Sequence, residues 1–155
     1  MRTSVCAFIL TIASSYSLAI TKEERKDILD SIRSTVEEKA GQPVRFKVEH
    51  LNLAKNWAVL VGSLLGAEGK KMDWSKAQDC DEDLDKMLWV VAQKQNNAWH
   101  VKDVDICSPE PPNWYLKPKV DYKRPCEIYE GLNIADSRTA EDECRAYQRK
   151  HPAKK

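Results

Sequence analysis

Two short segments of this chain, 57–61 and 87–92, are apolar at every position. A strand with one face exposed to solvent alternates between apolar and polar side chains. A strand that is apolar throughout must therefore be buried on both faces of its sheet. Segment 44–48 does alternate, and so does segment 99–106, where the alternation slips near Asp103 and indicates a β-bulge. The order of these four segments predicts a four-stranded antiparallel meander.

A single amphipathic helix is predicted ahead of these strands. Thr21 and Glu24 form a capping box, in which a hydroxyl cap is followed three residues later by a glutamate. Gly41 and Pro43 are typical of a helix end. Between them apolar residues recur every four positions, at Ile28, Ile32, Val36 and Ala40. One such helix covers only one face of a four-stranded sheet, so the second face needs other cover.

The second face is expected to be covered by the chain that follows Ser108. Residues 108–118 contain four of the seven prolines, which favours an extended strap over regular structure. Thr139 and Asp142 then predict the start of a short final helix, from Ala140 to about Lys150. A homodimer interface would cover the same face and is the alternative. The predicted fold class is α+β: an N-terminal helix packed on a four-stranded antiparallel meander, with a Pro/Cys-rich C-terminal strap and a short final helix.

The first 19 residues have the pattern of a secretory signal peptide. Arg2 precedes a mostly apolar stretch, and Ser17-Leu18-Ala19 has the small-residue form that signal peptidase cleaves. We therefore expect cleavage after Ala19 and a periplasmic or secreted location. The mature chain is expected to form a single disulfide-braced domain over 20–155, with a frayed basic tail at 150–155. An uncleaved N-terminal membrane anchor is the alternative.

Four cysteines follow the predicted cleavage site: Cys80, Cys107, Cys126 and Cys144. An even number of cysteines in an exported chain favours disulfides, although more than one pairing is open. Zinc binding is the alternative, but the chain has no C-x-x-C pair. A hairpin that turns at Asn96-Asn97 brings the residues near Cys80 close to Cys107. This favours a Cys80–Cys107 bond and leaves Cys126 and Cys144 to tie the strap to the last helix.

Charge and hydropathy argue against two classes of partner. The chain has 25 Lys and Arg residues against 24 Asp and Glu residues. A nucleic-acid binder normally carries a basic surplus, so no nucleic-acid partner is expected. Beyond the N-terminal stretch no apolar run approaches the roughly 18 residues that a membrane span requires. No stable membrane insertion is therefore expected after signal cleavage.

The densest charge cluster is acidic and lies in the long connection between the second and third strands. It comprises Asp79, Asp81, Glu82, Asp83 and Asp85. Alternating carboxylates also open calcium-binding loops, but Leu84 stands where such a loop needs glycine and Val90 where it needs glutamate. A solvated loop is therefore favoured, and no metal or cofactor is assigned.

No catalytic residue is assigned from the sequence. His50 and His100 lie on neighbouring parts of the predicted meander and would form part of a site if they converged, but histidines on strands are more often exposed. No Ser/His/Asp or Cys/His motif can be assembled, and oxidised cysteines cannot act as nucleophiles. The chain is therefore interpreted as non-enzymatic, with an enzyme as the alternative.

Aromatic residues in loops indicate a protein interface. Trp and Tyr on rigid, exposed segments are common interface anchors, whereas the competing interpretation is that they close the core beneath the strap. The predicted partner-binding residues are Trp74, Asp79, Asp81, Asp83, Trp114 and Tyr115. The acidic residues among them would suit a basic partner, such as a basic toxin or hydrolase.

Two parts of the chain form a distinctive pattern. The first is the helix at 25–40 with the following Gly41–Val48 and Asn56–Leu60, and the second is Ala98–Val101 with the strand before it. Together they resemble a group of small periplasmic proteins of Gram-negative bacteria. The resemblance spans residues 25–107 and implies a helix on a four-stranded meander, similar to the cystatin-like and NTF2-like folds. It brings no catalytic residues.

These features predict an exported, non-enzymatic protein-binding domain, such as an inhibitor or immunity protein against a secreted toxin or hydrolase. The alternative is a small NTF2-like enzyme or ligand carrier with a pocket between helix and sheet. Such a pocket needs polar residues on the inward face of the sheet. The candidates for that face are apolar: Phe46, Val48, Trp57, Val59, Trp89 and Trp99.

Overall fold

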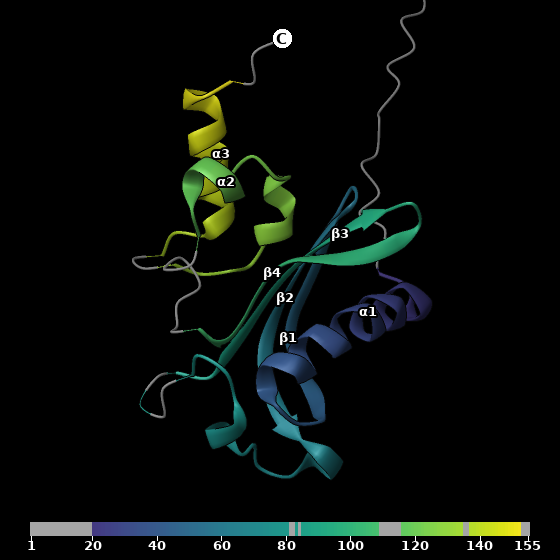
Figure 1. The fold of residues 1–155 in the computed structure, drawn as a ribbon. Helices are drawn as coiled ribbons and strands as arrows, with labels where there is room; N and C mark the ends of the chain where they lie inside the picture. The colour runs from purple at the N-terminus through teal and green to yellow at the C-terminus, as the bar shows by residue number, and fades with distance from the viewer. Residues whose placement is uncertain (1–19, 81–82, 84, 109–115, 135–136, 153–155) are drawn as a thin grey trace, which may run out of the picture.

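The computed structural model describes residues 20–80, 83, 85–108, 116–134 and 137–152 (Figure 1). The predicted signal peptide and the last three residues of the predicted basic tail lie outside these ranges. The elements are α1 (Lys22–Ala40), β1 (Val44–Ala54), β2 (Trp57–Gly66), η1 (Ala67–Gly69), η2 (Trp74–Lys76), β3 (Met87–Gln95), β4 (Ala98–Ser108), α2 (Pro118–Asp121), η4 (Cys126–Tyr129) and α3 (Ala140–Lys150). Within the described ranges, no helix is both long enough and apolar enough to cross a membrane.

The four strands form one antiparallel sheet in the order β1-β2-β3-β4, which confirms the predicted meander. β3 and β4 meet at a tight turn in which Asn96 and Asn97 both have positive φ, 50° and 62°. Asparagine tolerates this left-handed conformation better than most residues, which explains its use at the turn. The register of β4 against β3 shifts between Val101 and Asp103, so the predicted bulge is confirmed.

The ends of α1 are fixed by its caps, and its packing is fixed by its apolar stripe. The Thr21 hydroxyl accepts a hydrogen bond from the Glu24 N–H at 3.1 Å, which confirms the predicted cap. At the other end Gly41 has φ 64°, a left-handed conformation that glycine adopts without strain. The stripe packs on one face of the sheet in a first core that includes Ile28, Ile32, Val36, Ala40, Leu60, Leu88, Val90 and Trp99.

The second face of the sheet is covered by the C-terminal part of the chain, as predicted. We call residues 116–134 and 137–152 the C-terminal layer, and Figure 1 shows its helices on the opposite side of the sheet from α1. The parallel rings of Trp89 and Tyr129, with centroids 6.5 Å apart, join the sheet to this layer. The buried residues of this second core are Val59, Val61, Met87, Trp89, Val91, Leu116, Tyr122, Cys126, Ile128, Tyr129, Leu132, Ala140 and Cys144.

The sheet has no single inward face, and that part of the sequence interpretation is wrong. Of the six apolar candidates, three belong to the first core and three to the second: Phe46, Val48 and Trp99 lie with α1, and Trp57, Val59 and Trp89 lie with the C-terminal layer. Successive side chains of a strand point to opposite faces, so a strand that is apolar throughout contributes to both cores.

Of the predicted strap, 108–118, the structure describes Ser108 and residues 116–118, because residues 109–115 lie outside the described ranges. The expectation of a strap without regular structure is wrong at Ser108, which ends β4, and at Pro118, which begins the single-turn helix α2. Proline fits the first position of a helix because the N–H that it lacks would have no partner there.

The final helix and its disulfide agree with the sequence prediction. The Thr139 hydroxyl caps α3 by accepting a hydrogen bond from the Asp142 N–H at 3.1 Å. A disulfide joins Cys126 of η4 to Cys144 of α3, whose Cα atoms lie 5.6 Å apart. The short helix η4 itself was not predicted. The disulfide therefore holds together the two elements that lie over the second face.

Candidate functional site

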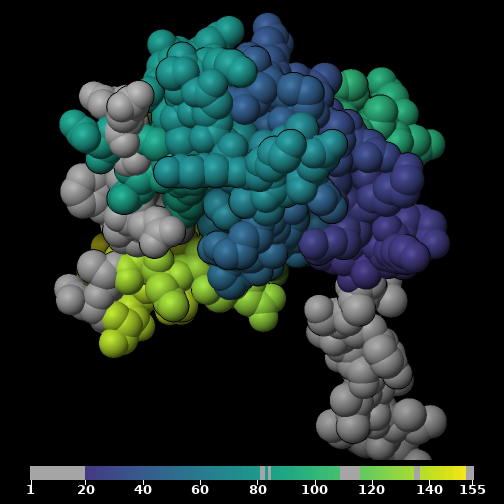
Figure 2. Space-filling view, turned by 90° about the horizontal axis from the view of Figure 1, so that it is seen from below, coloured from purple at the N-terminus to yellow at the C-terminus, as the bar shows by residue number. Residues whose placement is uncertain are grey.

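The predicted partner-binding residues fall in two parts of the chain. Trp74, Asp79 and Asp83 lie in the β2–β3 connection, residues 67–86. Figure 2 looks onto the end of the molecule that carries this connection, and its teal atoms form much of the exposed surface there. The remaining predicted residues, Asp81, Trp114 and Tyr115, lie outside the described residues.

The end of α1 holds the β2–β3 connection in place. The Gln42 side chain donates to the carbonyl of Asp73 at 2.6 Å and accepts from the N–H of Asp73 at 3.4 Å. The N–H of Gln78 donates to the carbonyl of Lys39 at 2.8 Å, which pairs one of the carbonyls left open at a helix end. These bonds fix the connection on both sides of Trp74.

Gly41 allows the connection to approach α1 closely. A Cβ atom at this position would lie 2.3 Å from the carbonyl oxygen of Lys76, well inside any normal contact distance. The φ of 64° at Gly41 also disfavours any other residue. The close fit between the helix end and the connection therefore depends on glycine.

Trp74 begins the one-turn helix η2, which Asp73 caps. The Asp73 carboxylate accepts hydrogen bonds from the Ser75 hydroxyl at 2.6 Å and from the Ser75 N–H at 3.3 Å. The hydrogen bond from the Ser75 hydroxyl, assisted by the nearby Lys76 ammonium, lowers the pKa of Asp73. The cap therefore stays ionised at neutral pH and keeps the turn around Trp74 closed.

The Trp74 indole is half-buried and combines an anchored side with an exposed one. Its anchored side packs against the first core, next to the buried side chain of Met72. The Lys86 ammonium lies 5.5 Å from the centroid of the indole ring. A hollow of about 300 Å³ opens beside the ring, lined by Lys71, Met72, Asp73, Trp74, Ser75 and Lys86. Trp74 and Met72 are the apolar residues in the lining of this hollow, and the other four are polar or charged.

The acidic residues lie toward the end of the β2–β3 connection, next to a disulfide. Asp79 and Asp83 are both exposed. The disulfide from Cys80 to Cys107, with Cα atoms 5.6 Å apart, ties this part to the end of β4 and is the pairing that the hairpin favoured. In the part of the chain that the structure describes, no three His, Cys, Asp or Glu side chains form a group that could hold a metal ion.

The two strand histidines do not share a site. His50 lies on β1 and His100 on β4, which form opposite edges of the sheet. Both side chains are exposed. The hypothesis that they converge is therefore wrong, because a meander separates its first and last strands by the two between them.

The space between α1 and the sheet is filled with apolar side chains. Leu60, Leu88 and Val90 from the strands are at most 2% exposed, and they meet Ile32 and Val36 from the helix, which are 0% exposed. The described side chains at the place where an NTF2-like pocket would open thus form a packed core. These residues are apolar, whereas an NTF2-like ligand carrier or enzyme needs polar side chains at this place.

One charged groove was not anticipated from the sequence. It lies between the β1–β2 turn and the C-terminal layer, where Lys55, Lys123 and Arg145 come together from three segments. No local pattern connects these residues, because they are far apart along the chain. The available signal was the pairing of Cys126 with Cys144, which places the segment around residue 124 beside α3.

Comparison with known proteins gives no relative of this chain: no family model, no curated protein and no solved structure matches it. The resemblance to small periplasmic proteins therefore stays an expectation.

Proposed function

We propose that this chain is an exported, non-enzymatic protein-binding domain that contacts its partner through the β2–β3 connection. One observation carries the proposal: a half-exposed tryptophan, Trp74, on a connection fixed by the end of α1 and by the Cys80–Cys107 disulfide. A long connection without strands normally loses conformational entropy when it binds. Here much of that entropy is already lost on folding, so more of the contact energy remains for affinity.

The chemistry of the connection favours a protein partner of basic character. Tryptophan is enriched among the few residues that dominate interface energies, and the hollow beside Trp74 can receive a side chain of the partner. The exposed carboxylates of Asp79 and Asp83 would attract a basic surface and speed its approach. An inhibitor or immunity protein against a basic secreted toxin or hydrolase fits this arrangement.

The two disulfides support the location that this function requires. Cys80–Cys107 and Cys126–Cys144 use all four cysteines that follow the predicted cleavage site. Such bonds persist in the periplasm and outside the cell and are rare in reducing compartments. A periplasmic or secreted binding protein is therefore proposed over a cytoplasmic one.

The experiment captures the partner and then measures the contribution of Trp74. The immobilised mature protein is incubated with periplasmic extract and culture medium, and the captured protein is purified for calorimetry. We expect Trp74→Ala to weaken the affinity at least about thirtyfold, the effect of a central interface residue. Val120→Ala is the matched control, because Val120 is 54% exposed and lies on α2, away from the connection.

Two results would count against the proposed function. One is a captured partner that binds the Trp74→Ala variant as tightly as the wild type, with both variants folded by circular dichroism. The other is an affinity loss of similar size in the Val120→Ala control.

A further inference from the structure

A second surface, at the other end of β2, has the features of an anion-binding groove. It has a volume of about 340 Å³ and is formed by the β1–β2 turn, by the segment 123–127 and by α3. β2 ends in Gly66, where the β2–β3 connection begins, and starts at Trp57 beside this groove. At roughly 3.3 Å per residue, the length of this strand places the groove about 30 Å from the start of the β2–β3 connection.

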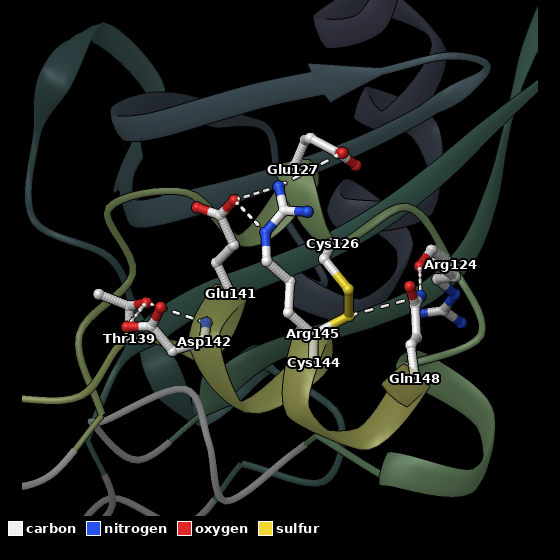
Figure 3. A network of polar contacts seen from close by, with 9 residues as sticks. All are labelled: Arg124, Cys126, Glu127, Thr139, Glu141, Asp142, Cys144, Arg145 and Gln148. Carbon is white, nitrogen blue, oxygen red and sulfur yellow. Dashed lines mark hydrogen bonds and ion pairs between the residues drawn. A yellow bond between two sulfur atoms is a disulfide. The ribbon is translucent and has the colours of Figure 1, made fainter. Parts of the chain in front are cut away.

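The floor of the groove is held rigidly. The Arg124 guanidinium lies 5.0 Å from the centroid of the Trp57 ring and is paired with the buried Asp121 carboxylate at 2.6 Å. The Gln148 amide donates to the carbonyls of Tyr122 and Arg124, at 2.9 and 3.0 Å. Figure 3 shows the Cys126–Cys144 disulfide next to the Gln148 side chain, which lies between it and Arg124. The Arg124 side chain and the backbone next to Lys123 are therefore held in place before any ligand arrives.

The charge of the groove is positive and partly unpaired. Lys55 and Lys123 are exposed at its rim and have no ion-pair partner within the described part of the chain. Arg149, which lines the adjoining hollow along α3, has none there either. A single acidic residue, Glu127, is among the groove's lining residues. Unpaired cations on a fixed frame attract anionic groups.

Arg145 shows which kind of anion the groove suits. Its guanidinium donates hydrogen bonds from Nε and Nη2 to the Glu141 carboxylate, at 2.9 and 2.6 Å. The same Nη2 lies 3.4 Å from the Glu127 carboxylate (Figure 3). The contact with Glu127 is the longer one, and the Glu127 side chain is 52% exposed. An incoming carboxylate can therefore replace Glu127 at Arg145 with little loss to the fold.

We propose that this groove binds an acidic segment of a protein, with its carboxylates between Lys55 and Lys123 and at Arg145. A carboxylate ligand follows from the two carboxylates already seated on Arg145. A protein segment, rather than a single small anion, follows from the spread of these cations over three segments of the chain around an open hollow of about 340 Å³. This surface is separate from the β2–β3 connection, so the proposal goes beyond the proposed function and does not depend on Trp74.

The test uses a short fluorescent peptide of alternating Glu and Gly, with its Gln/Gly counterpart, at low ionic strength. We expect the wild type to bind the Glu peptide, to release it as salt is added, and not to bind the Gln peptide.

The variant Lys55→Glu/Lys123→Glu weakens binding of the Glu peptide at least about tenfold. The matched control, Lys22→Glu/Lys47→Glu, changes the net charge equally at exposed lysines elsewhere and stays within about twofold of the wild type. Trp74→Ala also leaves peptide binding unchanged, which separates this test from that of the proposed function.

Three outcomes would overturn the proposal. The first is that the wild type does not bind the Glu peptide. The second is that the two double variants lose affinity equally, which would reveal a response to net charge alone. Alternatively, inorganic pyrophosphate or a heparin fragment binds through Lys55 and Lys123 more tightly than the Glu peptide, which would assign the groove to phosphate or sulfate. Matching thermal unfolding of the two double variants confirms that neither loss reflects misfolding.

Discussion

The buried hydroxyl of Tyr129, in the C-terminal layer, makes the free energy of unfolding depend on pH. Its side chain is 0% exposed, and the hydroxyl donates to the carbonyl of Asp121 at 3.0 Å. Burial raises the pKa of Tyr129, because a phenolate at this position would lose its hydration. In the unfolded chain a tyrosine titrates near pH 10, so above about that pH the unfolded chain releases a proton that the folded chain retains. The free energy of unfolding must therefore fall as the pH rises.

We expect this fall in urea denaturation curves followed by circular dichroism from about pH 8 to 11. Tyr129→Phe removes the hydroxyl, so at neutral pH it is less stable by about 1 kcal/mol, the usual worth of one hydrogen bond. Its stability also falls less steeply with pH than that of the wild type. Equal slopes for the two proteins would show that another group controls the alkaline transition.

At the scale of elements, helices with local end signals were predicted to their ends. α1 is specified by Thr21, Glu24 and Gly41, and α3 by Thr139 and Asp142, all of which act within a few residues of their own position. Such caps can be identified in sequence because the hydrogen bonds that they make are local. The packing of each helix then follows from its apolar side.

Strand lengths were predicted less well, because bulges interrupt the pattern that reveals strands. β1 was expected over 44–48 but continues to Ala54. The register with β2 shifts between Val48 and His50, so Glu49 is an extra residue and the alternation changes phase there. A pattern with a period of two cannot be followed through such a change from sequence alone.

The short elements of the C-terminal layer depend on contacts between distant residues. η4 lies where Tyr129 stacks on Trp89 and where Asn52 of β1 donates to the carbonyls of Ile128 and Glu130, at 3.2 and 2.7 Å. No local signal predicts these contacts. The same reason applies to the site: Trp74 was found through its type and its loop, whereas the basic groove forms only after three segments have met.

We expect substitution of Gly41 to destabilise the junction between α1 and the β2–β3 connection. Gly41→Ala adds about 1–2 kcal/mol of left-handed strain and forces the Lys76 carbonyl to move. Gly69→Ala is the matched control: its φ is 77°, but the nearest atom to an added Cβ is Arg45 Nη1 at 3.7 Å, so the strain comes without the clash. We expect urea denaturation to show the larger loss of stability in Gly41→Ala. Equal losses would mean that the close approach to Lys76 contributes nothing.

At the scale of the whole molecule, β2 and β3 are enclosed by two separate cores, and each core has its own disulfide nearby. Cys107 belongs to the first core, whereas Cys126 and Cys144 belong to the second. This two-sided arrangement was predictable, because strands that are apolar throughout need cover on both faces and a single helix supplies only half of it. The individual contacts between the C-terminal layer and the strands were not predictable, since many apolar side chains of the layer could cover the same strand residue.

The two disulfides are expected to protect different parts of the molecule. Cys126→Ala/Cys144→Ala opens a link with a sequence separation of 18 and should lower the free energy of unfolding by about 3 kcal/mol in the chain-entropy model. The layer over the second face then loosens first, so binding of the dye ANS should rise before the main unfolding transition. Cys80→Ala/Cys107→Ala, with a separation of 27, is the matched control and should lose similar stability without this rise. Dye binding that rises equally in both variants would contradict this division.

The C-terminal layer follows the sheet along the chain, and this order has a consequence for biosynthesis. A polypeptide is made from its first residue to its last, so β2 and β3 are complete while Tyr129 and Cys144 are still missing. During that interval Val59, Trp89 and Val91 are exposed to solvent, and nascent chains can aggregate through these apolar side chains. A premature stop before η4 would therefore release a product that aggregates, even though its sheet is complete.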